Sequence, residues 1–125
     1  MAQDRAGQTA TRYDWADMEV DHPIDSAARQ RIMAERMMVT RFVLRSDFHV
    51  EPHTHHNEQI SIVLEGRVRF TIGTIGSDEF REEILVAGQT IVIPPFVPHG
   101  ATVLERTVAL DLFSPPSEKT GVDQS

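Results

Sequence analysis

Two histidines separated by a single residue, and a third that follows a proline-rich turn, constrain this chain more than any other feature. His53 and His55 fall in a polar segment that ends at Gln59, and His99 follows residues 94–98. Side chains alternate along a β-strand, so residues at positions i and i+2 share one face. If His53 and His55 lie on a strand, their imidazoles converge, as the ligands of a transition metal must.

The rest of the chain is patterned as short strands separated by glycine and proline. Strands are expected over residues 28–33, 37–44, 60–65, 67–73, 79–86, 90–93, 100–104 and 107–113. Residues 60–65 and 67–73 are interpreted as two strands around a tight turn at Glu65-Gly66. A helix over 26–38 stays open as an alternative, because Ala, Arg, Glu and Met are good helix formers. This spacing of strands and turns is typical of an all-β sandwich or barrel.

The segment around the first two histidines resembles the first signature of the cupin family. That signature reads Gly, five residues, His-x-His, three or four residues, Glu, six residues and Gly. His53, His55 and Gly66 match it in register. Asp47 stands where the first Gly belongs, and Gln59 stands in place of the Glu.

The segment around the third histidine resembles the second cupin signature. That signature reads Gly, five residues, Pro-x-Gly, two residues, His, three residues and Asn. Gly88, Pro94 and His99 match it. Phe96 replaces the middle Gly, and Val103 replaces the Asn.

The resemblance implies the cupin jelly roll, a double-stranded β-helix and therefore an all-β fold. The barrel is expected over residues 26–114, after an N-terminal arm (1–25) that is partly disordered and before a polar tail (115–125). Small barrels leave sheet edges that need cover. The segment Tyr13-Asp-Trp15 carries large aromatic rings without a local partner. We therefore expect a homodimer in which this arm packs on the neighbouring barrel.

The expected cofactor is one divalent transition metal, bound by His53, His55, Gln59 and His99. The chain has no cysteine, so nitrogen and oxygen atoms must hold the ion. Zn, Ni, Fe, Mn and Cu all accept such ligands, and the sequence does not choose among them. Glu58 is the alternative to Gln59. Regular alternation turns Glu58 away from the side of His55, but a β-bulge would let its carboxylate bind.

The end of the last expected strand extends the resemblance to a narrower group, the pectin-degradation cupins that convert 4,5-unsaturated uronates to linear keto sugars. This resemblance implies that Asp111 and Phe113 line the substrate pocket, and Phe96 is expected there too. Asp111 also lies within an apolar run, where a carboxylate needs a reason. It is interpreted as the catalytic acid or base, with a structural aspartate at a strand end as the alternative.

The narrower resemblance fails at one position. The uronate-linearising cupins have an Arg four residues beyond the phenylalanine, and Ser117 stands there in this chain. That Arg would meet the sugar carboxylate, so only another cation could take its place. The candidates are Arg41, Arg67 and Arg69, and strand parity does not show which of them points inward.

The expected function is a metal-dependent enzyme acting on an oxygen-rich small molecule, by isomerisation, cyclisation or lyase chemistry on a sugar-acid-like or enol substrate. Three imidazoles and a carboxamide are all neutral, so the ion keeps its full charge as a Lewis acid. A dioxygenase is the first alternative, favoured if Glu58 binds the metal. A non-enzymatic binding or sensory cupin is the second, favoured if Asp111 is paired away from the metal.

Composition excludes several other classes of function. A formal net charge of −7 with no concentrated basic patch argues against a nucleic-acid partner. No apolar run is long enough to span a bilayer, and the first twenty residues lack the apolar core of a signal peptide. The expectation is a single-domain cytoplasmic protein whose partner is a small-molecule substrate, without a membrane contact.

Overall fold

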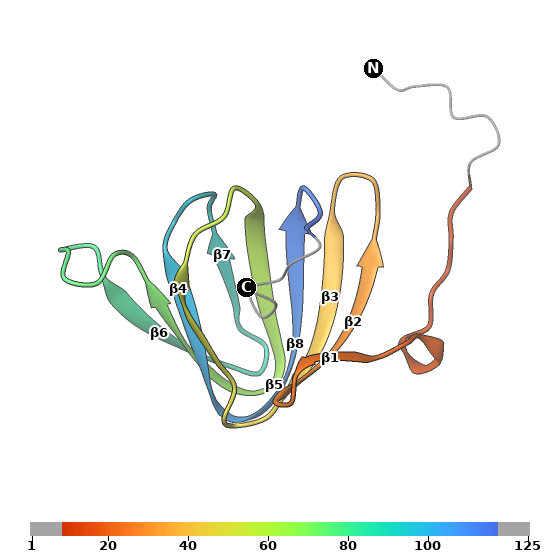
Figure 1. The fold of residues 1–125 in the computed structure, drawn as a ribbon, viewed down its shortest axis with the longest axis horizontal. Coiled ribbons are helices and arrows are strands. Elements are labelled where there is room, and N and C mark those ends of the chain that lie inside the picture. The colour runs from red at the N-terminus through yellow and green to blue at the C-terminus, as the bar shows by residue number, and fades with distance from the viewer. Residues whose placement is uncertain (1–8, 118–125) are drawn as a thin grey trace, which may run out of the picture.

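The computed structural model describes residues 9–117, which form an antiparallel β-structure (Figure 1). A short 3₁₀ helix, η1 (Trp15–Asp17), precedes the strands. The strands are β1 (Asp21–Ile24), β2 (Ala27–Met33), β3 (Met38–Leu44), β4 (His49–His53), β5 (Glu58–Ile72), β6 (Arg81–Val86), β7 (Thr90–Ile93) and β8 (His99–Ser114). The all-β prediction is confirmed, and the helical alternative over 26–38 is wrong. Across residues 9–117, no helix has the length and apolar character needed to cross a membrane.

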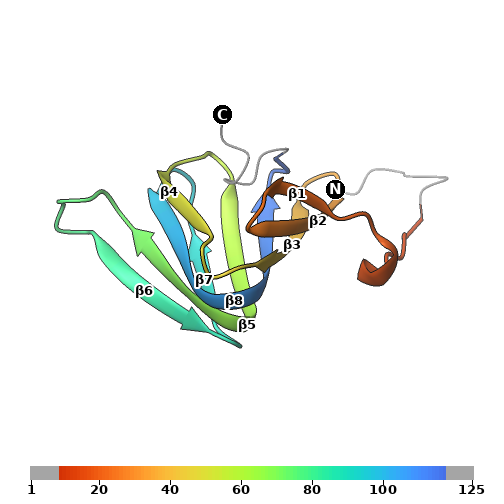
Figure 2. The same ribbon diagram turned by 60° about the horizontal axis from the view of Figure 1, so that its bottom comes forward.

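Two long strands, β5 and β8, form the backbone of the fold. They pair with each other along most of their length, and each bends at the bottom of Figure 1. β8 pairs with β4 through its first half and with β3 through its second, while β5 pairs with β7 and then with β6. Because each long strand joins two sets of neighbours, the strands curve around a common interior, as Figure 2 shows.

The tight turn expected at Glu65-Gly66 is absent, because β5 continues through both residues as one strand. Three register shifts between Val63 and Val68 bend the strand without reversing it. Gly66 has φ +96°, and a Cβ there would lie 2.3 Å from the carbonyl oxygen of Arg106. Only glycine tolerates both the positive φ and the close approach of β8. The Glu-Gly pair therefore marks a bulged bend in a continuous strand.

Apolar side chains at alternate positions of the strands face inward and form the interior of the barrel. Phe42, Val63, Val68, Phe70 and Val103 are 1–6% exposed and belong to one apolar cluster. Fully burying a side chain of this kind stabilises the fold by about 1.5–3 kcal/mol. The same inward face of β5 also carries two polar residues at its start, and these belong to the site described below.

Within the described residues 9–20, the segment before β1 is attached to β2 by hydrogen bonds. Asp14 caps η1 by accepting a hydrogen bond from the backbone N–H of Ala16 at 2.9 Å. The side-chain amide of Gln30 on β2 donates to the carbonyls of Trp15 (2.6 Å) and Met18 (3.2 Å). The aromatic ring of Tyr13 is left 54% exposed.

Candidate metal centre

Three imidazoles converge at one end of the barrel. His53 ends β4, His99 begins β8, and the two are directly opposite each other in the β4–β8 ladder. His55 reaches the same point from the loop between β4 and β5. One nitrogen from each ring lies within 4.8 Å of the others. The ring centroids are 4.5 Å (His53–His99), 4.8 Å (His55–His99) and 5.5 Å (His53–His55) apart.

The route by which His55 arrives differs from the strand alternation expected from the sequence. Of His53 and His55, only His53 lies on a strand, and the chain leaves β4 directly after it. The buried Asn57 anchors the loop through a hydrogen bond from its side-chain amide to the carbonyl of Pro115. The backbone N–H of Phe96 donates to the carbonyl of His55 at 2.8 Å, which ties the two histidine-bearing loops together.

Each of the three rings is held by its Nδ1 atom. His53 contacts the carbonyl of Glu51 at 2.9 Å, His55 that of Asn57 at 3.0 Å, and His99 that of Val97 at 2.9 Å. A carbonyl oxygen only accepts hydrogen bonds, so Nδ1 must carry the proton in all three rings. The Nε2 lone pairs are then free to bind a metal, which is the arrangement that neighbouring carbonyls impose on histidine ligands.

Among the three histidines, His99 has the surroundings that most strongly indicate a metal ligand. Its ring is 4% exposed, and its Nε2 atom is buried without a hydrogen-bond partner among residues 9–117. Burial lowers the pKa of His99 to about 4, with the nearby His53 and His55 acting in the same direction and the Val97 carbonyl opposing them. The imidazole is therefore neutral at pH 7. A buried, neutral, unpaired nitrogen aimed at two other imidazoles fits a metal ligand.

Gln59 supplies an oxygen beside the three imidazoles. Its side chain is 6% exposed, and its Oε1 lies 3.1 Å from Nε2 of His55. Both atoms could reach one ion, since N and O ligands of zinc lie about 2.0–2.2 Å from it. Glu58, the alternative ligand, is exposed and lies outside the cluster. The structure thus brings together His53, His55, His99 and Gln59.

A hydroxyl that the sequence reasoning missed links this cluster to Asp111. The side-chain amide of Gln59 donates to Oγ of Ser61 at 2.9 Å, which fixes its Oε1 toward the histidines. Ser61 is directly opposite Asp111 in the β5–β8 ladder and hydrogen-bonds its carboxylate. Because the hydroxyl oxygen of Ser61 accepts a hydrogen bond from the Gln59 amide, its O–H is available to donate a hydrogen bond to the Asp111 carboxylate. Alternation from Gln59 would have identified Ser61, since the two share the inward face.

Asp111 is surrounded by protein yet faces an open cavity. Its position opposite Ser61 on one side and Thr40 on the other places it in the middle of the barrel wall. Burial raises its pKa from 3.8 to about 6, and the hydrogen bond from Ser61 acts in the opposite direction. Its remaining exposure is to a cavity of about 60 Å³, which it lines together with Gln59, Ser61, His53 and His99.

The two phenylalanines expected in the substrate pocket have different surroundings. Phe113 is 2% exposed and packs edge-on against His55, with the ring centroids 5.9 Å apart. Phe96 is 67% exposed and has φ +66°, in the left-handed region that the glycine of the family signature would adopt freely. Neither ring is among the residues that line the cavity.

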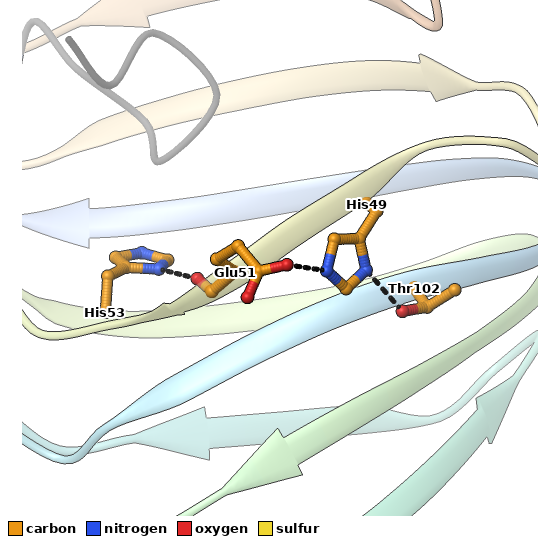
Figure 3. A network of polar contacts seen from close by, with 4 residues as sticks. All are labelled: His49, Glu51, His53 and Thr102. Carbon is orange, nitrogen blue, oxygen red and sulfur yellow. Dashed lines mark hydrogen bonds and ion pairs between the residues drawn. The ribbon is translucent and has the colours of Figure 1, made fainter.

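A second hydrogen-bonded group supports His53 from outside the barrel (Figure 3). Nε2 of His49 lies 2.7 Å from a carboxylate oxygen of Glu51, and its Nδ1 lies 2.8 Å from the hydroxyl of Thr102 on β8. Glu51 also provides the carbonyl that holds His53. The exposed His49 therefore fastens β4 to β8 next to a metal-ligand candidate.

The donor set suits a divalent transition metal. Three neutral imidazoles and one carboxamide oxygen fit Zn, Ni, Fe, Mn or Cu, and nothing in the set selects one of them. The unpaired Nε2 of His99 is the observation that a bound ion would explain.

Comparison with known proteins gives a consistent result. The family model for cupins matches residues 22–117. An RmlC-like cupin from Shewanella frigidimarina is 23% identical, with a TM-score of 0.77 over 89% of this chain and 96% of that one. KdgF from Halomonas sp. is 22% identical, with a TM-score of 0.78 over 88% of this chain and 97% of that one. Oxalate decarboxylase from Bacillus subtilis, which has Mn(II) centres, is 16% identical, with a TM-score of 0.74 over 90% of this chain but 32% of that one. At these identities the likeness to solved structures extends to the fold, and it confirms the predicted jelly roll.

Proposed function

The chain belongs to the cupin family, and on that premise we propose that it is a metal-dependent enzyme that moves a proton within a small oxygen-bearing substrate. Isomerases, lyases and cyclases of enol or keto compounds work in this way. The observation that carries the proposal is Asp111, a carboxylate in the same cavity as the histidine cluster and joined to it through Ser61 and Gln59.

Asp111 has the properties of a general base. With a pKa of about 6, its carboxylate is mostly ionised at pH 7 and still basic enough to accept a proton. It would take a proton from a carbon next to a carbonyl, or from a hydroxyl, and return it to a neighbouring atom of the same substrate. The hydroxyl of Ser61 holds the carboxylate in place and donates to it in its charged form. The proton is neither gained nor lost over the cycle, so no co-reactant is needed.

The remaining polar residues would hold the metal. His53, His55, His99 and Gln59 are the ligands that the geometry brings together. A bound divalent ion would act as a Lewis acid toward a substrate oxygen and make the adjacent proton easier to remove. The backbone carbonyls orient each ring through Nδ1 so that Nε2 faces the cluster, and Ser61 keeps the carboxamide oxygen of Gln59 toward it.

The dioxygenase alternative has less support. A carboxylate ligand from Glu58 would favour it, but Glu58 is exposed while Gln59 is buried. The two-histidine-one-carboxylate set typical of non-haem iron oxygenases is not formed by the cluster.

Hydrogen exchange at carbon tests the proposal with a panel of simple compounds. Metal-loaded protein is incubated in D₂O with small ketones, hydroxy ketones and keto acids, and deuterium incorporation is followed by NMR. We expect exchange at the carbon next to the carbonyl for at least one compound. Asp111→Asn should slow it by roughly 10²–10⁴ while the metal content stays unchanged. Equal exchange rates at equal metal occupancy would remove Asp111 from the mechanism.

A further inference from the structure

The wall of the cavity next to the histidine cluster changes from polar to apolar within two residues along each strand. Asp111 lies between Thr40 and Ser61 in the strand ladders. Two residues further into the barrel, the corresponding position is Ala109, which lies between Phe42 and Val63. One rung of the wall is therefore polar, and the next is entirely apolar.

The apolar part of the lining is much the larger. The polar lining residues are His53, Gln59, Ser61, His99 and Asp111, whereas the apolar ones come from β3, β4, β5 and β8 and from the loop between β3 and β4. They include Phe42, Phe48, Val50, Val68, Phe70 and Val103. Beyond the polar rung a ligand would meet hydrocarbon alone, without a partner for a hydroxyl.

Within residues 9–117, no cationic side chain lines the cavity. Arg41 alternates with the inward-facing Phe42, and its guanidinium donates to Gln30 on β2 at 3.3 Å. Arg67 and Arg69 alternate with Val68 and Phe70, whose side chains are the ones that line the cavity. None of the three arginines therefore replaces the one missing from the position of Ser117. A substrate carboxylate placed away from the metal would lose water, find no counter-charge and share the cavity with Asp111.

The cavity is also small. Its volume is about 60 Å³, on the measure by which one water molecule needs about 10–15 Å³. It is therefore several times the minimum that one water molecule requires. A chain of a few carbons suits this mostly apolar lining better than a hexuronate, whose ring carries hydroxyls that the apolar wall cannot pair.

We propose that the cavity takes a small molecule with a chelating oxygen head and a short hydrocarbon body, the head at the histidine cluster and the body against the apolar wall. This inference rests on the proposed function for the role of the metal, and it replaces the sugar acid as the substrate class. The body would be bound by burial of its apolar surface and the head by the metal and the polar rung.

A homologous series of hydroxamic acids tests this, because every member presents the same chelating head. Binding of aceto-, butyro- and hexanohydroxamate to the metal-loaded full chain is measured by titration calorimetry. Affinity should rise about fourfold for each added methylene until the cavity is full. Succinic monohydroxamate, which has the length of butyrohydroxamate but ends in a carboxylate, should bind about tenfold more weakly or worse. Galacturonate should not compete with butyrohydroxamate at millimolar concentration.

A matched pair of variants locates the hydrocarbon body. Ala101→Leu places extra volume in the cavity, whereas Ala87→Leu makes the same change at an exposed position between β6 and β7. Ala101→Leu should abolish the gain with chain length and leave acetohydroxamate binding intact, while Ala87→Leu should behave as wild type. If Ala101→Leu does not fold, the chain-length series on the wild type decides.

The possible failures are distinguishable. Acetohydroxamate binding without a gain from added methylenes, or tighter binding of the carboxylate-ended probe, would overturn the substrate class and leave the metal site and Asp111 untouched. No hydroxamate binding by protein of full metal content would overturn both the substrate class and the proposed site.

Discussion

Replacing Asp111 by Asn should stabilise the metal-free protein at neutral pH. Asn has nearly the shape of Asp and can still accept the hydrogen bond from Ser61, but it carries no charge. Folding raises the pKa of Asp111 from 3.8 to about 6. At about 1.4 kcal/mol per pKa unit, keeping this carboxylate ionised costs the folded state about 3 kcal/mol at pH 7.5. Asp111→Asn removes that cost.

The sign of the pH dependence follows from which state holds the proton more tightly. Between pH 4 and 6 the folded protein keeps the Asp111 proton while the unfolded chain has released it, so this group's contribution to stability falls as pH rises and stays low above pH 6. His99 acts in the opposite direction, because its pKa falls from 6.5 to about 4 on folding and its contribution rises with pH over that window. The pH-dependent contributions of Asp111 and His99 to stability largely cancel in the wild type. The difference between Asp111→Asn and wild type isolates Asp111, since both proteins contain His99.

Urea unfolding followed by far-UV circular dichroism in the presence of EDTA measures this difference at pH 3.5, 5.5 and 7.5. The free energy of unfolding of Asp111→Asn relative to wild type should grow by about 3 kcal/mol from the lowest to the highest pH. Asp78→Asn, the same change in the exposed loop between β5 and β6, should stay within about 0.5 kcal/mol of wild type. A difference that does not change with pH, or an Asp111→Asn variant less stable than wild type at pH 7.5, would refute the reasoning.

Four further outcomes are expected. His55→Ala should lose tight metal binding in metal analysis of purified protein, whereas the neighbouring His56→Ala should retain it; equal loss in both would contradict the ligand set. Ser61→Ala should weaken metal affinity by about 10–100-fold, because the carboxamide ligand loses the hydrogen bond that orients it, and Ser61→Thr should recover most of the loss. Phe96→Gly should raise the free energy of unfolding by about 1 kcal/mol, since an exposed Phe with positive φ is strained, and Phe96→Ala should give no such gain. We propose that the protein is a homodimer in which the arm that carries the exposed Tyr13 packs on the neighbouring barrel. Light scattering at low micromolar concentration should give about twice 14.1 kDa, and a monomer would refute the proposal.

Much of the candidate site could be predicted from local patterns. The two signature stretches identified the family, and the alternation of strands identified an all-β fold. The choice of Gln59 over Glu58 rested on the same alternation, and Gln59 is the residue that the structure turns inward. Such inferences succeed because side-chain direction along a single strand is a local property of the backbone.

The arrangement across strands depended on the tertiary structure. Glu65-Gly66 has the composition of a turn, yet pairing with β8 carries β5 through it as a bulged bend. His55 enters the cluster from a loop, and the partnership of Ser61 with Asp111 depends on the β5–β8 register. The direction of the arginines was undecidable until the inward face of each strand was known. Alternation states only that neighbouring residues oppose each other, whereas the sheet's curvature and register decide which face encloses the cavity.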